Sequence, residues 1–253
     1  MAYTEREQNI LNILNDTPSV DVKTLTRLLF ASEATVRRDL RKLEEKGLII
    51  RAHGKALNAS VYADKNVGFD FREQLLSPVK KKIARAAVNF CVTDGNVVML
   101  DASSTAMCAV EYLKDKKDVI VITSGLKTLM LLSQTDLKFY STGGLAINKS
   151  SSFVGQTAIN TVKSFNADVC LVSCHGLSRN GYVTDTSERE NDLRNAIVKQ
   201  CKRKVLLIDS SKLEQEFWHN LCNISEFDDV FCDTPLPDEI LKTVKSFHIV
   251  SDA

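Results

Sequence analysis

The stretch "SEATVRRDLRKLEEKGLIIRAHGKA", Ser32–Ala56, predicts a helix with one basic face, followed by a hairpin. Val36, Leu40 and Leu43 are spaced by four and three residues, which is the spacing of a buried stripe along a helix. Positions such as Arg38 point away from this stripe, at about 100° per residue. Four cations lie within six residues of one another: Arg37, Arg38, Arg41 and Lys42. The exposed face of the predicted helix therefore concentrates positive charge.

Two interpretations of this charge remain open from the residues alone. Between Ser32 and Ala56 there are seven Lys or Arg and four Asp or Glu, a local excess of three. A solvated helix face explains such an excess. A surface that meets nucleic-acid phosphates explains it too, because a helix fits the major groove and arginines bind guanine edges or phosphates.

The neighbouring residues predict a small domain of three helices and a hairpin. Upstream, "TEREQNILNILND" places Ile10 and Leu14 on one face of a first helix. Asp21 can cap a second helix, "VKTLTRLLF", and Ser32 can cap the third, which Gly47 ends. After it, "LIIRAHGKAL" predicts two short strands, each with a basic residue, that form a wing along a DNA backbone.

The same stretch resembles the N-terminal signature of the DeoR family of bacterial transcriptional regulators. That signature reads Ser-Glu-x-Thr-Ile/Val-Arg-Arg-Asp-Leu, then Leu-Glu, Gly-Leu, Arg and His-Gly-Gly-Ala, and it is matched here except at Lys55, where the family has a second glycine. The resemblance implies a winged helix-turn-helix over residues 1–57, with the helix-turn-helix at about 20–39, that binds double-stranded operator DNA. The residues expected to contact DNA are Ser32, Ala34, Thr35, Arg37, Arg38, Arg41, Arg51, His53 and Lys55.

Beyond residue 77 the sequence changes to short apolar runs that alternate with helical patterns. Near-continuous β-branched runs of this kind indicate parallel strands buried on both faces, as in an α/β domain. The sequence therefore predicts an α/β domain with a mainly parallel sheet over residues 77–253, joined by a linker at 58–76. The predicted strands are "NVVMLD" (96–101), "VIVIT" (119–123), "LKFYST" (137–142), "ADVCLVSC" (167–174), "KVLLIDS" (204–210) and "DVFCDT" (229–234).

Small and polar residues follow the predicted strands, where a parallel α/β sheet binds its ligands. "DASSTAM" places Ser104 and Thr105 at the start of a helix, where hydroxyls and backbone N–H groups favour an anion. Each such residue can equally be a helix cap or turn residue. Their recurrence after successive strands favours one shared crevice.

The family resemblance extends over this half, from about 77 to 252, and implies a sugar-phosphate effector domain. The implied domain is similar to the fold shared by sugar-phosphate isomerases and CoA transferases, in which the Ser-Ser-Thr loop holds phosphate. The resemblance implies that Lys212 neutralises a ligand oxygen, while Asp101 and Glu190 face sugar hydroxyls. The sequence departs from the family at Ser124 and Leu213. The residues expected to bind effector are Asp101, Ser103, Ser104, Thr105, Thr123, Ser124, Gly143, Gly144, Gly176, Glu190 and Lys212.

Composition limits the remaining classes of protein. Net charge is only +1, so nucleic-acid binding must come from a local patch. The seven cysteines include no Cys-x-x-Cys pair, which favours reduced thiols over disulfides or a metal site. No run approaches the roughly 20 apolar residues of a membrane span, and "MAYTEREQNI" lacks a signal pattern. We expect a cytoplasmic protein with no cofactor and no metal.

The leading hypothesis is a transcriptional regulator, in particular a repressor of a sugar-metabolism operon controlled by a sugar phosphate. A helix-turn-helix reads few base pairs, so we expect at least a homodimer, or a homotetramer. The alternative is a sugar-phosphate isomerase, because fold does not settle chemistry. The sequence shows no compact acid/base cluster and its four histidines are scattered, so we expect no enzyme activity.

Overall fold

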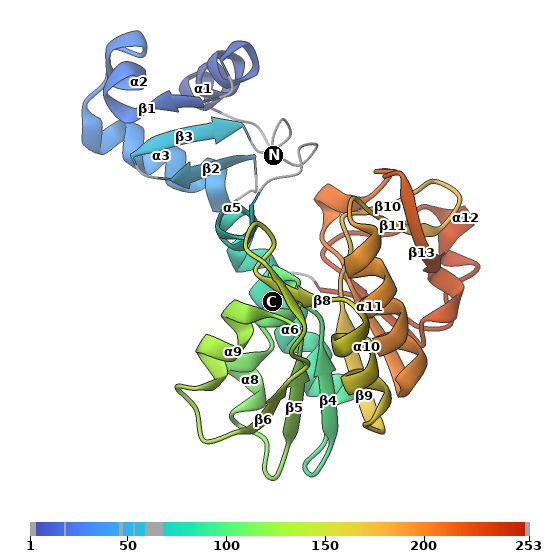
Figure 1. Cartoon of the computed structure of the whole chain (residues 1–253). Helices are drawn as coiled ribbons and strands as arrows, with labels where there is room; N and C mark the ends of the chain where they lie inside the picture. The colour runs from blue at the N-terminus through green and yellow to red at the C-terminus, as the bar shows by residue number, and fades with distance from the viewer. Residues whose placement is uncertain (1–3, 18, 46–47, 53, 59–67, 251–253) are drawn as a thin grey trace. The chain divides into compact units, whose positions relative to one another are not determined.

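The computed structural model describes residues 4–17, 19–45, 48–52, 54–58 and 68–250 (Figure 1). The chain divides into two compact units, Met1–Pro78 and Val79–Ala253. No helix in the described part of the chain is both long and apolar enough to cross a membrane.

The first unit has the predicted three helices and hairpin, and a third strand. Its elements are α1 (Glu5–Asp16), β1 (Ser19–Asp21), α2 (Val22–Leu28), α3 (Glu33–Glu45), β2 (Ile49–Ala52), β3 (Lys55–Asn58) and α5 (Phe69–Gln74). β1 is too short for its pattern to have been recognised, and it pairs with β3 to give an antiparallel sheet in the order β1-β3-β2.

Local chemistry accounts for where these helices begin. Thr4 and Glu7 form a reciprocal capping box at the start of α1. The Asp21 side chain accepts a 2.8 Å hydrogen bond from the Thr24 N–H and caps α2, as predicted. The apolar stripes of the three helices then meet in one core, in which Ile10 and Leu14 are fully buried.

The second unit is built on a seven-stranded parallel sheet in the order β15-β14-β12-β9-β4-β5-β6. The strands are β4 (Val97–Leu100), β5 (Ile120–Thr123), β6 (Lys138–Ser141), β9 (Ala167–Val172), β12 (Cys201–Leu207), β14 (Asp229–Cys232) and β15 (Phe247–Ile249). Six of them are the predicted strands, so the predicted fold class is confirmed. The sequence analysis missed β15, which is a three-residue edge strand.

Helices cover both faces of this sheet, as Figure 1 shows. α6 (Ser77–Cys91), α7 (Ser104–Met107), α8 (Val110–Leu113) and α9 (Leu126–Leu132) pack on one face. α10 (Gln156–Lys163), α11 (Glu188–Gln200) and α12 (Asp238–Leu241) pack on the other. Alternate strand residues enter the two cores, since Leu100 lies in the first and Met99 in the second.

Two antiparallel additions to the parallel sheet were not predicted. β7 (Leu145–Ile147) and β8 (Ser152–Val154) form a hairpin. β10 (Gly176–Leu177), β11 (Tyr182–Asp185) and β13 (His219–Asn223) form a second sheet in the order β10-β11-β13. Their strands are only two to five residues long, so period-two patterning is weak in the sequence.

The segment expected to be an irregular linker, 58–76, contains α5, and this helix falls within the first unit. A six-residue helix spans fewer than two turns, so its sequence shows no clear helical periodicity.

Candidate functional site

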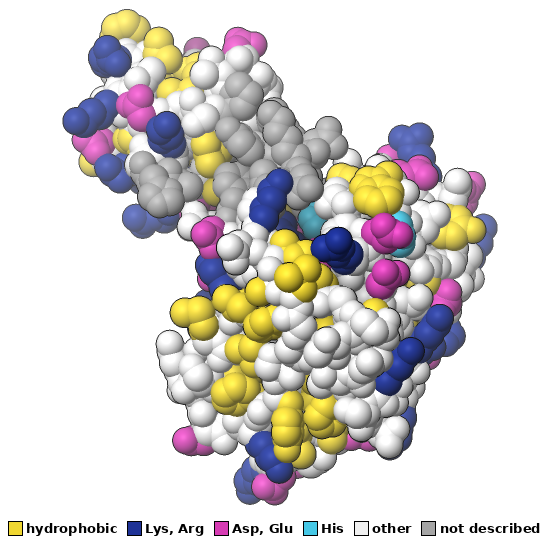
Figure 2. Space-filling view, viewed as in Figure 1, with side chains coloured by type: hydrophobic (Ala, Val, Ile, Leu, Met, Phe, Trp, Pro, Cys, Tyr) yellow, Lys and Arg dark blue, Asp and Glu magenta, His cyan; other side chains and the backbone are white. Residues whose placement is uncertain are grey.

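The exposed face of α3 carries the predicted cations. Val36, Leu40 and Leu43 are fully buried, and this fixes which side of the helix faces outward. Arg38 and Arg41 are exposed on that side, and Figure 2 shows several Lys and Arg side chains on the first unit over α2 and α3. The cations on α3 are therefore available to a duplex.

Three other residues predicted on α3 have local partners. Arg37 donates to Glu33 at 2.6 Å in an exposed ion pair one turn away. The Ser32 hydroxyl accepts a 3.3 Å bond from the Thr35 N–H and lies 2.8 Å from the Thr35 hydroxyl, so both side chains take part in the helix start. Exposed Ala34 has the small side chain that a close approach to base edges requires.

The β2–β3 hairpin forms the expected wing. Ala52 pairs with Lys55 across a turn in which Gly54 has φ of +76°, a conformation that favours glycine. Lys55 begins β3 and is exposed, so the departure from the family motif leaves the hairpin intact. Arg51 instead donates to Glu44 at 2.7 Å and joins the wing to α3. His53 lies outside the described residues.

The sequence analysis missed the two ionic contacts that hold α3 against α1. The Arg6 guanidinium donates to Asp39, and the hydrogen bond raises the pKa of Arg6. Asp39 is buried on the inner side of α3, next to Leu40. Glu7 is likewise buried and lies 3.8 Å from the Lys42 ammonium. A buried carboxylate within the apolar stripe of a helix is the sequence signal that could have revealed this contact.

In the second unit, two lysines meet the polar loop that follows β4. The Lys80 ammonium donates to the Ser104 hydroxyl at 3.1 Å. The Lys212 ammonium lies 3.4 Å from the Thr105 hydroxyl and donates to Ser173 at 2.6 Å. Two cations from distant parts of the chain thus contact adjacent hydroxyls.

The lysine environment is partly neutralised by one buried carboxylate, Asp209. Its Oδ2 atom lies 3.6 Å from the Lys212 ammonium. Burial raises the pKa of Asp209, but the charges of Lys212 and Lys80, together with hydrogen bonds from Ser211, hold that pKa below its ordinary value of 3.8. The three groups therefore carry one net positive charge.

Lys80 was not predicted as a site residue, although the sequence holds a signal for it. It lies three residues before Ile83 and four before Ala84, on the buried stripe of α6. Only 3% of Lys80 is exposed. A lysine within an apolar stripe needs a polar partner, and here Ser104 is one.

Ser103 and Asp101 serve the loop backbone. The Ser103 hydroxyl accepts from the Ala106 N–H at 3.0 Å and caps α7, a role that the sequence left open for Ser104. Asp101 accepts from the backbone N–H groups of Ser103 and Ser173 at 3.0 and 3.2 Å. The loop is thereby fixed in shape before any ligand binds.

Arg194 on α11 joins Asp101 to a second buried carboxylate. Its Nε donates to Asp101 at 2.8 Å, and its Nη1 donates to Asp185 at 2.9 Å and to Asn191 at 2.7 Å. Burial raises the pKa of Asp185, but the Arg194 charge and a 2.9 Å contact with His175 hold that pKa well below its ordinary value. Arg194 was not predicted, because its two carboxylate partners lie in other elements, Asp101 after β4 and Asp185 at the end of β11.

A small cavity lies beside this ion-pair cluster. It is lined by Asp101, Ala102, Ser124, Ser152, Phe153, Glu190, Leu193, Arg194 and Ile197. Glu190 accepts a 2.6 Å bond from the Ser152 hydroxyl. The structure therefore brings together three predicted effector residues, namely Asp101, Ser124 and Glu190.

The remaining predicted effector residues have backbone roles. Thr123 accepts from the Gly125 N–H at 3.0 Å and shapes the turn after β5. Gly143 and Gly144 have φ of +61° and +106° in the turn after β6. A Cβ on Gly176 would lie 2.4 Å from the Gln215 carbonyl oxygen. Backbone conformation at Gly143 and Gly144, and close packing at Gly176, therefore explain these glycines without a ligand.

Both units match known domains. Residues 6–60 match the DeoR-like helix-turn-helix domain, and residues 77–234 match the DeoR C terminal sensor domain. A ribose 5-phosphate isomerase A from Methanocaldococcus jannaschii is 18% identical, with a TM-score of 0.41 over 54% of each chain. A likeness of this size is partial and carries no information about activity.

Relatives of known name match nearly the full length of the chain. The L-fucose operon activator of Haemophilus influenzae is 29% identical over 97% of this chain and 98% of its own. The transcriptional repressor GlcR of Bacillus subtilis is 30% identical over 94% and 91%. The glycerol-3-phosphate regulon repressor of Escherichia coli is 24% identical over 98% of each. With its sensor-domain match spanning more than half of the residues, this chain belongs to the DeoR family of transcriptional regulators.

Proposed function

We propose that this chain represses a sugar-metabolism operon by binding operator DNA, and that a phosphorylated sugar sets its operator affinity. Two of the relatives named above are repressors and one is an activator, and all three names concern an operon, a regulon or transcription. α3 supplies exposed arginines for base edges and phosphates, and the wing supplies Lys55 for the backbone. The protein acts in the cytoplasm, where its operator lies.

The observation that carries the effector proposal is the meeting of Lys80 and Lys212 at Ser104 and Thr105. These four side chains offer two ammonium groups and two hydroxyls at one loop. A phosphate dianion can replace the hydroxyl contacts with charge-assisted hydrogen bonds, which are roughly twice as strong as neutral ones. The net positive charge left by Asp209 favours a phosphorylated ligand over a neutral sugar.

The sugar part of the ligand would bind toward the cavity that contains Glu190 and Ser124. Their carboxylate and hydroxyl oxygens accept hydrogen bonds from sugar hydroxyls. The Ser152 hydroxyl, which now donates to Glu190, is one contact that a sugar hydroxyl can replace. Because α11 carries both Glu190 and Arg194, a ligand there can shift a helix that is tied to the phosphate loop through Asp101.

We propose that the chain is not an enzyme. Isomerisation of a sugar phosphate requires a carboxylate or another group that can take up a proton near the phosphate. Asp101 and Asp185 are both bound by Arg194, and the lowered pKa of Asp185 makes it a weak base. These two carboxylates are suited to hold a helix in place.

A thermal-shift panel of sugar phosphates and the matching free sugars tests the proposed effector class. A ligand at 100 times its Kd should add about 2.7 kcal/mol to the stability of the folded state. Trp218, the only tryptophan of the chain, gives a second readout, because its ring lies 5.3 Å from that of His219, whose Nδ1 contacts Asn191 at 2.9 Å. At least one sugar phosphate should raise the melting temperature and change Trp218 fluorescence, while its free sugar does neither.

A further inference from the structure

The turn between α2 and α3 holds an aromatic ring outward at a strained position. Phe30 has φ of +48°, in the left-handed region that bulky residues rarely adopt. Its surface is 97% exposed, and neighbouring Leu28 is 54% exposed. A glycine or asparagine would fit this turn with less strain and without exposing a ring. Among the described residues of the first unit, Phe30 takes no part in the hydrophobic core.

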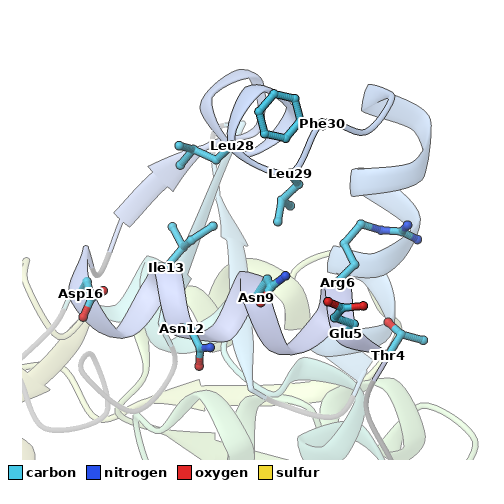
Figure 3. A pocket seen from close by; sticks show the side chains of 10 residues that line it. All are labelled: Thr4, Glu5, Arg6, Asn9, Asn12, Ile13, Asp16, Leu28, Leu29 and Phe30. Carbon is cyan, nitrogen blue, oxygen red and sulfur yellow. The ribbon is translucent and has the colours of Figure 1, made fainter.

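A groove opens beside this ring, between α1 and the end of α2. Its volume is about 710 Å³, and it is lined by Thr4, Glu5, Arg6, Asn9, Asn12, Ile13, Asp16, Leu28, Leu29 and Phe30. Figure 3 shows Ile13 on α1 directed toward the end of α2, where Leu28, Leu29 and the Phe30 ring lie above it. The groove thus has apolar walls that can receive a ring, and polar groups along α1.

Of the three charged residues of α1 that line the groove, Glu5, Arg6 and Asp16, the last two can pair across a twofold axis. Arg6 lies in the first turn of α1 and Asp16 at its last residue, and both line the groove. In a twofold contact with the two α1 helices antiparallel, Arg6 of one copy faces Asp16 of the other. Arg6 already donates to Asp39 through Nε, but a guanidinium has five N–H donors, so others remain for a second carboxylate.

We propose that two copies of this chain associate through this face, with Phe30 of each copy seated in the α1–α2 groove of the other. A protruding ring and a fitting groove side by side on one surface are what a twofold contact requires, since each copy must supply both. None of the cations on the exposed face of α3 lines the groove. The inference rests on the proposed function, because an operator with two half-sites requires two copies of the DNA-binding unit.

Photocrosslinking of the full-length chain tests this contact. Phe30→p-benzoylphenylalanine keeps an aromatic ring at the turn, and chains carrying it are mixed with isotopically heavy chains before irradiation. We expect mixed light–heavy crosslinks that map by mass spectrometry to the α1 segment of the heavy chain. The inference would be overturned if crosslinks formed only within the light chain, only to added mixed-sequence duplex, or not at all.

Filling the groove of the heavy chain distinguishes a specific contact from collision. Asn9→Trp places a large side chain in the groove and should lower the crosslink yield severalfold. Gln8→Trp, on the same helix but not lining the groove, should leave it unchanged. Equal yields with both variants would contradict the inference. Binding of each variant to the duplex is measured in parallel, so loss of DNA binding with intact crosslinks counts against the proposed function and for the contact.

Discussion

At the scale of single residues, Lys212 is the side chain expected to govern the effector response. Lys212→Ala removes a cation that contacts both Thr105 and Ser173. A hydrogen bond to a charged group is worth about 1.5–3 kcal/mol, so calorimetry should show sugar-phosphate affinity falling roughly 10- to 150-fold. Ser104→Ala should cost less, because Lys80 remains.

Lys202→Ala is the matched control for that prediction. Lys202 is exposed and pairs with Asp168 on β9. This variant should bind the sugar phosphate with wild-type affinity, and both lysine variants should retain operator binding. The assignment of the phosphate site is wrong if the free sugar binds as tightly as its phosphate.

Buried carboxylates should make the second unit sensitive to acid. The pKa of Asp209 lies below 3.8 in the folded chain because the charges of Lys212 and Lys80 and the hydrogen bonds from Ser211 together outweigh burial, so the unfolded chain binds more protons in that range. The stabilisation is present above about pH 4 and is lost as the pH falls through the folded pKa. Asp209→Asn should flatten the acid limb of urea unfolding followed by Trp218 fluorescence. An unchanged acid limb would show that Asp209 is not stabilised in this way.

At the scale of elements, α3 should determine which sequence is bound. Arg38 is exposed on the face opposite the buried stripe, and one good contact to a base contributes about 1–3 kcal/mol of discrimination. Arg38→Ala should therefore reduce operator affinity in an anisotropy titration and bring it close to the affinity for mixed-sequence DNA. Arg85→Ala, an exposed arginine on α6, should bind as the wild type does. Unchanged operator affinity for Arg38→Ala would remove α3 from the interface.

The wing should contribute affinity without sequence preference. Lys55→Ala should weaken binding to every duplex and flatten the salt dependence by about 0.9, the change expected for one phosphate contact. Arg51→Ala should behave differently, because Arg51 is bound to Glu44 and its loss also loosens the wing from α3. We expect a lower melting temperature for Arg51→Ala only. Equal melting temperatures would mean that the Arg51–Glu44 pair does not hold the wing.

The elements that the sequence predicted are those with a regular apolar pattern. The stripe at Val36, Leu40 and Leu43 is buried as expected. The six longer parallel strands form in the predicted places, but β6, at the edge of the sheet, is mostly exposed instead of buried on both faces. The unpredicted β1, β15, β7–β8 hairpin and β10-β11-β13 sheet are short, so tertiary contacts decide them more than local pattern does.

The sequence predicted those residues of the candidate site that belong to a local motif. The Ser-Ser-Thr loop and Lys212 do meet, in the contact between Lys212 and Thr105. Lys80 and Arg194 were missed, because Ser104 lies 24 residues from Lys80, and Asp101, which Arg194 joins to Asp185, lies 93 residues from Arg194. Long-range pairing of this kind depends on strand order, which no spacing along one sequence reveals.

At the scale of the whole molecule, the proposed function requires that a ligand bound to the second unit changes how the first unit binds DNA. A ligand changes DNA affinity only if it binds the conformation that binds DNA and the conformation that does not with different affinities. Such coupling typically amounts to about 1–3 kcal/mol. The same coupling must appear in reverse, because operator DNA changes effector affinity by the same factor.

The most direct test is an anisotropy titration of an operator selected from genomic fragments, with the full chain and the sugar phosphate that stabilises it most. We predict that the sugar phosphate lowers operator affinity by roughly 5- to 150-fold, that its free sugar leaves the affinity unchanged, and that Lys212→Ala binds operator but does not respond. The account is contradicted if the sugar phosphate binds the chain and operator affinity stays the same.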